Sequence, residues 1–285
     1  MSDLLVFGAN GQVARELARL APDARFLGRT AADLTDPKAC RGAVLESGAH
    51  RIINAAAYTA VDKAESEPEL AYAINTTAPG VIAEAAREIG ATFVHVSTDY
   101  VFDGSGTASW APEDTPAPLG TYGATKLAGE RAVTAIGGRH AILRTSWVFS
   151  AHGQNFLKTI LRLSETRDAL NIVDDQIGGP TSAASIARAV LTVSEQLRDG
   201  TAPSGIYHFS GAPDVSWAGF AQAIFAAAGR NVDVTPIPSS DYPTPAPRPL
   251  NSRLDCASTE QTFGIPRPDW RDDLNDVLDE LRARD

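Results

Sequence analysis

The chain runs Leu4-Leu5-Val6-Phe7-Gly8-Ala9-Asn10-Gly11-Gln12-Val13-Ala14 near its N-terminus, and this stretch predicts the fold. Its apolar start is typical of a strand that is buried in a parallel sheet. The helical pattern after the glycines has Leu17, Ala18 and Leu20 on one face. A glycine turn between a strand and a helix lets backbone N–H groups approach a pyrophosphate at the positive end of the helix. The stretch therefore indicates a dinucleotide site, with a plain tight turn as the alternative.

Further apolar runs alternate with helical patterns along the first half of the chain. They are Arg25–Gly28, Arg51–Ile53, Phe93–Val96 and His140–Leu143. This rhythm predicts an α/β fold with a Rossmann-like, doubly wound parallel sheet. The rhythm then loosens, so we expect a dinucleotide-binding domain in residues 1–150 and a mainly substrate-binding region in residues 151–285. Parts of residues 181–212 are expected to return to the main sheet, which would interleave the two domains.

Composition limits the classes of function that the chain can have. Apolar residues make up 44% and charged residues 21%, which is ordinary for a globular protein. The formal net charge of −10 argues against a nucleic-acid-binding protein, because such a protein needs a basic face. No run reaches membrane-spanning length, and the two cysteines, Cys40 and Cys256, form no disulfide framework. We therefore expect a cytoplasmic protein that binds neither nucleic acid nor membranes.

The end of the second predicted strand bears on the choice of cofactor. An acid near this point usually binds the ribose diol of NAD, whereas an arginine suits the 2′-phosphate of NADP. Arg29 lies at this place, about 20 residues after the first glycine. We therefore expect NADPH, with a solvated loop charge as the alternative role of Arg29. The small residues Ala55, Ala56 and Ala57 follow the third strand, where they would let a cofactor lie close to the backbone.

Tyr122-Gly123-Ala124-Thr125-Lys126 places a phenol and an ammonium on one face of a predicted helix, one turn apart. A lysine ammonium favours a nearby phenolate, so we expect it to bring the acid–base equilibrium of the phenol closer to working pH. The alternative is a surface Tyr and Lys at chance spacing. Ser97-Thr98-Asp99 ends the strand just upstream, and within that strand His95 is expected to be a core residue.

Together these features resemble the extended short-chain dehydrogenase/reductase family, in which Tyr and Lys act with a Ser or Thr. One branch, the dTDP-4-dehydrorhamnose reductases, is similar nearly end to end. The Tyr242–Leu254 run is far more specific to this branch than the glycine pattern. The similar stretches are Asn54–Glu65, Ser97–Gly104, Tyr122–Glu130, Arg144–Val148, Asp174–Thr181 and Tyr242–Leu254.

The resemblance implies NADPH-dependent reduction of the C4 keto group of dTDP-4-dehydro-L-rhamnose to dTDP-L-rhamnose, with NADH as a second cofactor that relatives can accept. It implies the catalytic set Thr98, Tyr122 and Lys126. Tyr122 would give a proton to the C4 oxygen, Thr98 would hydrogen-bond that oxygen, and Lys126 would hold the nicotinamide ribose. Implied cofactor-binding residues are Gly8, Asn10, Gly11, Gln12, Val13, Arg29, Asp33, Leu34, Ala55, Ala56, Ala57, Tyr122 and Lys126. Implied residues for the dTDP-sugar are Thr98, Asp99, Tyr100, Trp147, Asn155, Arg248 and Arg253.

Several of these assignments have alternatives. Arg248 and Arg253 suit a diphosphate, but loop pairing is the other reading. Trp147 could stack on a sugar or a base, or could be a core aromatic. Asp33 sits by the adenine in relatives, and otherwise would be a helix cap.

The resemblance also raises the question of a metal. Some bacterial relatives bridge subunits through acidic residues that bind magnesium, so a homodimer is an open expectation. Glu16 and Glu280 match two of these positions, but Ala184 stands at the third. Because a hard dication needs several oxygen ligands, magnesium is doubtful and we expect no metal site. A second departure is Ala14, which stands where a third glycine is usual.

Two other functions stay open. One is reduction of the keto group of another nucleotide-activated deoxysugar. The other is a non-catalytic NADP-binding subunit that regulates a partner, as in the related regulatory subunit of methionine adenosyltransferase. The intact set Thr98, Tyr122 and Lys126 argues against the second, because a pure binder need not keep all three.

Overall fold

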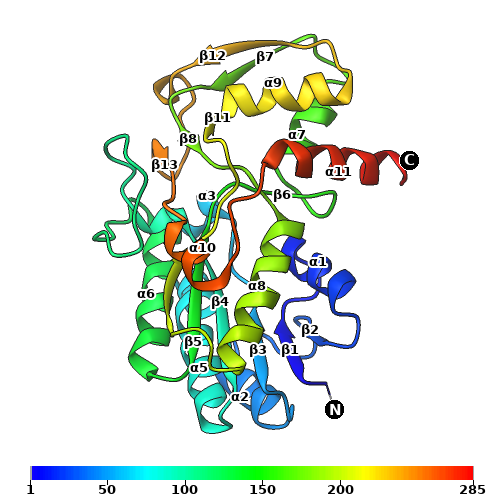
Figure 1. Ribbon diagram of the computed structural model, residues 1–285. Coiled ribbons are helices and arrows are strands. Elements are labelled where there is room, and N and C mark those ends of the chain that lie inside the picture. The colour runs from blue at the N-terminus through cyan, green and yellow to red at the C-terminus, as the bar shows by residue number, and fades with distance from the viewer. Residues whose placement is uncertain (1, 285) are drawn as a thin grey trace.

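The computed structural model describes residues 2–284 of the chain and contains a central parallel sheet that is covered on both faces (Figure 1). Every neighbouring pair of strands in this sheet is parallel. From one edge to the other the strands are β10 (Gly205–His208), β5 (His140–Thr145), β4 (Thr92–Thr98), β3 (Arg51–Asn54), β1 (Leu4–Phe7) and β2 (Arg25–Leu27). The doubly wound α/β fold predicted from the sequence is confirmed.

The strand order locates the place where a ligand should bind. In chain order the sheet reads 2-1-3-4-5-6, which resembles the flavodoxin-like order more than the 3-2-1-4-5-6 order of the Rossmann fold. The chain turns from one side of the sheet to the other between β1 and β3. In open α/β sheets, ligands bind outside the carboxyl ends of the strands at this switch point.

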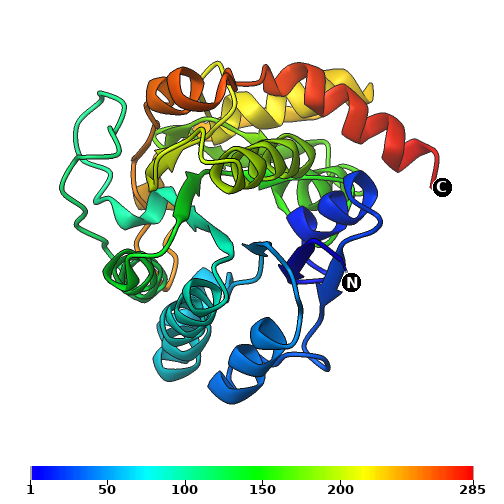
Figure 2. The ribbon, with the colours of Figure 1, turned by 60° about the horizontal axis from the view of Figure 1, so that its bottom comes forward.

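The two faces of the sheet are packed by different helices. In β1, Leu4 and Val6 point to the face covered by α1 and α8, whereas Leu5 and Phe7 point to the face covered by α2, α5 and α6. Figure 2 shows these helices on opposite sides of the strands. The helices that flank the sheet are α1 (Gln12–Leu20), α2 (Pro37–Leu45), α5 (Ala78–Glu88), α6 (Thr121–Ile136) and α8 (Ala183–Arg198).

Helix α6 carries the predicted Tyr–Lys pair and packs closely against the segment that follows β4. A Cβ atom at Gly123 would lie 2.1 Å from the carbonyl oxygen of Tyr100, so only glycine permits this approach. Short helical segments surround this contact and connect the strands to the flanking helices. They are α3 (Val61–Ala64), α4 (Pro68–Tyr72), the π-helix η1 (Ala73–Thr77) and the 3-10 helix η2 (Asp99–Val101).

A second region lies above the carboxyl ends of the strands, at the top of Figure 1. Its core includes Phe149, Leu157, Phe220 and Trp270. Its helices are α7 (Phe156–Leu163), α9 (Trp217–Ala228) and α11 (Trp270–Arg282), whereas α10 (Ala257–Phe263) packs on α8 and β10 of the main sheet. Its short strands pair as β6 (Val148–Phe149) with β9 (Thr181–Ser182), β7 (Ala169–Val173) with β12 (Asp233–Ile237), and β8 (Ile177–Gly178) with both β11 (Val215–Ser216) and β13 (Asn251–Ser252).

The chain returns from this second region to the main sheet. Helix α8 packs on β3, β4 and β5, and β10 pairs with β5 with Ile206 opposite Ile142. The proline-rich residues 236–250 form no α-helix, as predicted; the 3-10 helix η3 (Ser239–Asp241) follows the end of β12, and the rest up to residue 250 forms neither helix nor strand. Among residues 2–284, no helix has the length and apolar character that crossing a membrane requires.

Candidate active site

A cavity of about 790 Å³ lies at the carboxyl ends of the central strands, at the predicted switch point. Its wall contains every residue assigned above to the cofactor, from the glycine turn to Lys126. It also contains five of the seven residues assigned to the sugar nucleotide, which are Thr98, Asp99, Tyr100, Trp147 and Asn155. Arg248 and Arg253 do not belong to this wall. The structure therefore brings segments from β1, β3, β4 and β5 into one site.

The glycine turn fits a dinucleotide phosphate. Gly8 has a φ of 114°, which residues other than glycine rarely adopt. A Cβ atom there would lie 3.4 Å from the backbone of Ala55. Gly11 is the N-cap of α1 and provides no side-chain cap for the first N–H groups of this helix. These N–H groups are therefore available to a phosphate at the positive end of the helix.

Arg29 lies on the rim of the cavity with its side chain 81% exposed. Its Nε atom is 3.1 Å from Oδ2 of Asp33. Hydrogen bonds from Thr35, and then Arg29, lower the pKa of Asp33 to about 2. The carboxylate does not cap a helix: Asp36 accepts from the N–H groups of Lys38 and Ala39 at the start of α2. An exposed guanidinium at this position can turn toward a 2′-phosphate.

Tyr122 is the most buried phenol in the wall of the cavity, with 9% of its surface exposed. Its ring contacts that of Tyr100 edge to face, with the centroids 5.4 Å apart. The expectation that Lys126 brings its acid–base equilibrium toward neutrality is wrong, because burial raises the pKa of Tyr122 to about 12. The Thr98 hydroxyl acts in the opposite direction, and the charge of Asp99 raises the pKa further. Tyr122 is therefore protonated at neutral pH, which is the form that a general acid needs.

Lys126 is almost completely buried, with 1% of its surface exposed. Its Nζ atom donates to the carbonyl oxygen of Val96 at 2.7 Å and lies 3.2 Å from Nε2 of His95. Burial lowers the pKa of Lys126 to about 8, and the carboxylate of Glu130 acts against this shift. The structure thus confirms His95 as a buried residue, but it also places His95 against the lysine.

Thr98 ends β4 and faces the cavity beside Asp99. The Thr98 hydroxyl donates to Oδ1 of Asp99 at 3.1 Å and accepts from the N–H of Tyr100 at 3.2 Å. Burial raises the pKa of Asp99 to about 6, and its Oδ2 atom has no hydrogen-bond partner among residues 2–284. Both side chains thus place polar atoms in the wall of the cavity at the end of β4.

Thr145 is a residue of the site that the sequence did not reveal. It lies in the wall of the cavity, and its buried hydroxyl has no hydrogen-bond partner within the described part of the chain. It ends β5, next to Thr98 at the end of β4. Its position at the carboxyl end of a central strand is the signal that could have identified it.

Trp147 both lines the cavity and packs against another aromatic residue. Its ring stacks on that of Trp217 with a centroid distance of 3.6 Å and an angle of 9°. Its φ of 49° lies in the left-handed region, where a bulky residue is strained. The two sequence interpretations of Trp147 are therefore compatible, since one ring face can be packed while the other part borders the cavity.

Asn155 connects the second region to the glycine turn. Its side-chain amide donates to Oε1 of Gln12 at 2.8 Å and to the carbonyl oxygen of Ser150 at 2.8 Å. Its Oδ1 atom caps α7 by accepting from the N–H of Lys158. The side chain therefore holds the two regions together at the mouth of the cavity.

Both predicted arginines make protein contacts. Arg248 donates to Oδ2 of Asp62 at 2.8 Å, while its buried Nη1 atom lacks a partner among residues 2–284. Arg253 donates to Oδ1 of Asn251 at 3.0 Å. Arg248 is the better candidate for an anionic ligand, because one of its nitrogens is left free to bind.

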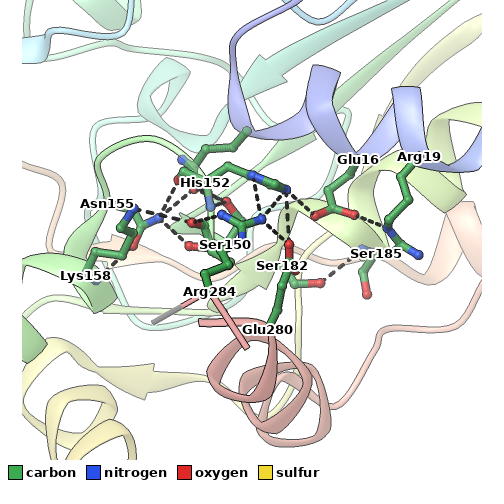
Figure 3. A network of polar contacts seen from close by, with 12 residues as sticks. Glu16, Arg19, Ser150, His152, Asn155, Lys158, Ser182, Ser185, Glu280 and Arg284 are labelled. Carbon is green, nitrogen blue, oxygen red and sulfur yellow. Dashed lines mark hydrogen bonds and ion pairs between the residues drawn. The ribbon is translucent and has the colours of Figure 1, made fainter. Parts of the chain in front are cut away.

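Glu16, His152 and Glu280 form a cluster between α1, the loop before α7 and α11 (Figure 3). His152, not Ala184, joins the two acids, and its Nε2 atom is 3.1 Å from Oε1 of Glu16. Arg19 pairs with Glu16, and Arg284 pairs with Glu280. With two guanidinium groups on two carboxylates, the cluster is a charge-balanced contact and a poor match to the oxygen ligands that magnesium prefers.

Comparison with known proteins shows the family of this chain. The model of the family described as RmlD substrate binding domain matches residues 1–283. A dTDP-4-dehydrorhamnose reductase from Sinorhizobium fredii is 45% identical over 94% of each chain. The enzyme of the same name from Escherichia coli K12 is 40% identical over 98% of each chain.

Solved structures show the same architecture. A dTDP-4-dehydrorhamnose reductase from Clostridium acetobutylicum superposes with a TM-score of 0.92 at 37% identity, covering 98% of this chain and 99% of that one. The reductase from Bacillus anthracis str. Ames, solved in complex with NADP, has a TM-score of 0.92 at 34% identity and covers 98% of this chain and 100% of that one. Since the family model matches residues 1–283, this chain belongs to the RmlD family.

Proposed function

We propose that this chain reduces the C4 keto group of dTDP-4-dehydro-L-rhamnose to dTDP-L-rhamnose with NADPH, and that Thr98, Tyr122 and Lys126 perform the chemistry. The observation that carries the proposal is the single cavity that joins the glycine turn to these three side chains. The names of the relatives, together with the NADP complex of one of them, support the substrate and the cofactor.

The residues divide the work as follows. The N–H groups at the start of α1 bind the pyrophosphate, and Arg29 binds the 2′-phosphate. NADPH, when bound, supplies the hydride for the carbonyl carbon. Tyr122 donates its proton to the C4 oxygen, and the Thr98 hydroxyl orients that oxygen. Proton transfer by a positioned side chain is typically worth about 10²–10⁴-fold in rate.

The dTDP-sugar fills the part of the cavity between Thr98 and Trp147. Asp99, Tyr100 and Asn155 contact the sugar, and Arg248 with Arg253 bind the diphosphate. Arg248 is held by Asp62, so its guanidinium loses little side-chain entropy when the ligand binds. Arg253 has a weaker case, because its contacts are local.

Organisation and location complete the proposal. Residues 1–150 form the dinucleotide-binding domain and residues 151–285 the substrate-binding region, with parts of 181–212 in the main sheet. We propose a homodimer in the cytoplasm, where reducing conditions suit the free cysteines Cys40 and Cys256. Sedimentation analysis tests the dimer.

The decisive experiment measures oxidation of NADPH with dTDP-4-dehydro-L-rhamnose (dTDP-4-dehydro-6-deoxy-L-mannose), and the product is then identified by NMR. Turnover to dTDP-L-rhamnose is expected. Binding of NADPH without turnover would instead indicate a regulatory subunit. A product with the other configuration at C4 would indicate a different 4-ketoreductase.

A further inference from the structure

Three buried polar side chains form a continuous chain behind the proposed active site. They come from three elements: Asn54 ends β3, His95 lies in β4, and Lys126 lies in α6. Asn54 and His95 are 0% exposed and Lys126 is 1% exposed. Nδ2 of Asn54 lies 3.1 Å from Nδ1 of His95, and Nε2 of His95 lies 3.2 Å from Nζ of Lys126.

The Asn54 end of this row of side chains determines the direction of the hydrogen bonds along it. Oδ1 of Asn54 accepts from the backbone N–H of Ala56 at 3.1 Å. A backbone N–H can only donate, so it determines which end of the Asn54 amide is the oxygen. The other end, Nδ2, must then donate to Nδ1 of His95. Nδ1 is therefore an acceptor.

His95 in turn has one proton to place. Complete burial lowers the pKa of His95 well below the usual 6.5, so the imidazole is neutral. A neutral imidazole carries one N–H, and since Nδ1 accepts, that proton lies on Nε2. The Nε2–H group points at Lys126.

The contact between His95 and Lys126 depends on the charge of the lysine. An ammonium has three donors and no acceptor, so an N–H that faces it meets another donor. An uncharged amine has a lone pair that can accept from Nε2–H while one of its own N–H bonds still donates to Val96. If the Asn54 amide were turned, Nδ1 of His95 would carry the proton and Nε2 could accept from the ammonium of Lys126. The NH₂ group of Asn54 would then face the N–H of Ala56, which is costly in a buried position.

We propose that Asn54 and His95 are positioning residues for the reduction, because they hold Lys126 in place and favour its uncharged amine over the ammonium. This inference rests on the proposed role of Lys126. As the pH changes, Lys126 gains or loses its proton at Nζ, while His95 keeps its single N–H on Nε2 in both states.

Other charged and titratable groups around Lys126 act in both directions. Glu130 lies one turn along α6 and favours the ammonium, but Ser97 at 2.5 Å and Arg144 at 2.7 Å already bind its carboxylate. Tyr122 and Asp99 lie on the cavity side. Burial lowers the pKa of Lys126 to about 8, in the direction that the hydrogen-bond chain also favours.

The direct test is the position of the proton on His95 in the full chain without ligands. Protonated and unprotonated ring nitrogens give distinct ¹⁵N signals, and through-bond correlations assign them without any substitution. The expected result at pH 7 is a proton on Nε2 and none on Nδ1. A proton on Nδ1, or on both nitrogens, would overturn the proposal. The reductase assay plays no part in this measurement, so failure of the proposed function is seen separately.

Two substitutions test the consequence for Lys126. Asn54→Asp reverses the direction of these hydrogen bonds, because a carboxylate accepts from both Ala56 and Nδ1–H of His95. The Nε2 atom then becomes an acceptor that favours the ammonium. NMR titration of the Lys126 side chain should move to higher pH by about one unit or more, and the pH profile of kcat should move with it.

His95→Gln is the matched variant that adds no charge. Its amide oxygen can turn toward the ammonium, so the titration should again move to higher pH, by roughly half a unit or more. An unchanged titration in both folded variants, or a shift to lower pH, would contradict the proposal. If neither variant folds, the proton position in the unsubstituted chain decides the question.

Discussion

The two walls of the cavity differ in what they are made of. The cofactor wall, formed by residues 8–13, Arg29 and residues 55–57, consists mainly of glycine and alanine residues at the ends of adjacent strands. The substrate wall, formed by residues 98–100, Trp147 and Asn155, also depends on partners far away in sequence: Trp147 stacks on Trp217, and Asn155 donates to Gln12. The first wall depends on local conformation and the second on tertiary contacts. Substitutions should therefore act differently on the two walls, and Tyr122, which lies between them, should be the most sensitive position.

The largest effect is expected for Tyr122→Phe. Phenylalanine keeps the ring and its packing but has no proton to donate, so kcat should fall by about 10² or more. The Kd for NADPH should stay close to that of the unsubstituted chain, because the cofactor wall is intact. Stopped-flow kinetics and fluorescence titration measure the two quantities. A variant that keeps more than about a tenth of kcat, with chemistry rate-limiting, would refute the role of Tyr122.

Lys126→Met should behave differently from Tyr122→Phe, because the lysine serves both walls. It is expected to lower kcat and also to weaken NADPH binding. A Tyr–Lys pair with a purely structural role would not separate rate from binding in this way. Equal patterns in the two variants would remove the distinction.

Arg248→Ala should have the next largest effect, and only on the sugar nucleotide. Loss of one charge-assisted hydrogen bond is worth about 1.5–3 kcal/mol, so KM for the sugar nucleotide should rise about ten- to a hundredfold. KM for NADPH should change little. Arg230→Ala, at an exposed position after α9, is the control for loss of a positive charge. Similar changes in both KM values would point to a folding role for Arg248.

Arg29→Ala should affect only the choice of cofactor. The exposed guanidinium is expected to bind the 2′-phosphate, so the ratio of kcat/KM for NADPH to that for NADH should fall by roughly tenfold. Arg25→Ala is the matched control, because Arg25 is exposed at the start of β2, the strand that Arg29 follows. A preference for NADH in the unsubstituted chain, or a ratio that does not change, would refute this assignment.

The smallest effect is expected for Arg284→Ala, which removes a contact of α11 outside both walls. Arg284 is 41% exposed and its partner Glu280 is 37% exposed, so solvent screens the pair. The free energy of unfolding should change by less than about 1 kcal/mol in denaturant titrations, with kcat unchanged. A loss of roughly 3 kcal/mol or more would show that the Glu16–His152–Glu280 cluster is essential for joining α11 to α1.

The contrast between the walls also explains what the sequence could reveal. The glycine turn, Arg29 and the Tyr122–Lys126 spacing are local patterns, and the structure brings all of them to the cavity. The strand order was not predictable, because it depends on pairings between distant segments. Thr145 has no local motif and becomes visible only when β5 lies beside β4.

Two properties of Tyr122 and Lys126 on α6 could not be predicted from the sequence either, because they depend on how the helix packs. The spacing of Tyr122 and Lys126 suggested a phenol shifted toward neutrality, but burial acts more strongly and raises its pKa. The contact of His95 with Lys126 joins residues on two different elements, β4 and α6, 31 positions apart in sequence. Alternation along β4 could place His95 on the side of α6, but not against a particular residue.

The most direct test of the account is the transfer of a label between the two walls. NADPH that carries deuterium at the transferable position of its nicotinamide is mixed with dTDP-4-dehydro-6-deoxy-L-mannose and this chain, and the product is examined by NMR. The expected product is dTDP-L-rhamnose with deuterium at C4 of the sugar. Deuterium at another carbon, or oxidation of NADPH without label in the sugar, would contradict it.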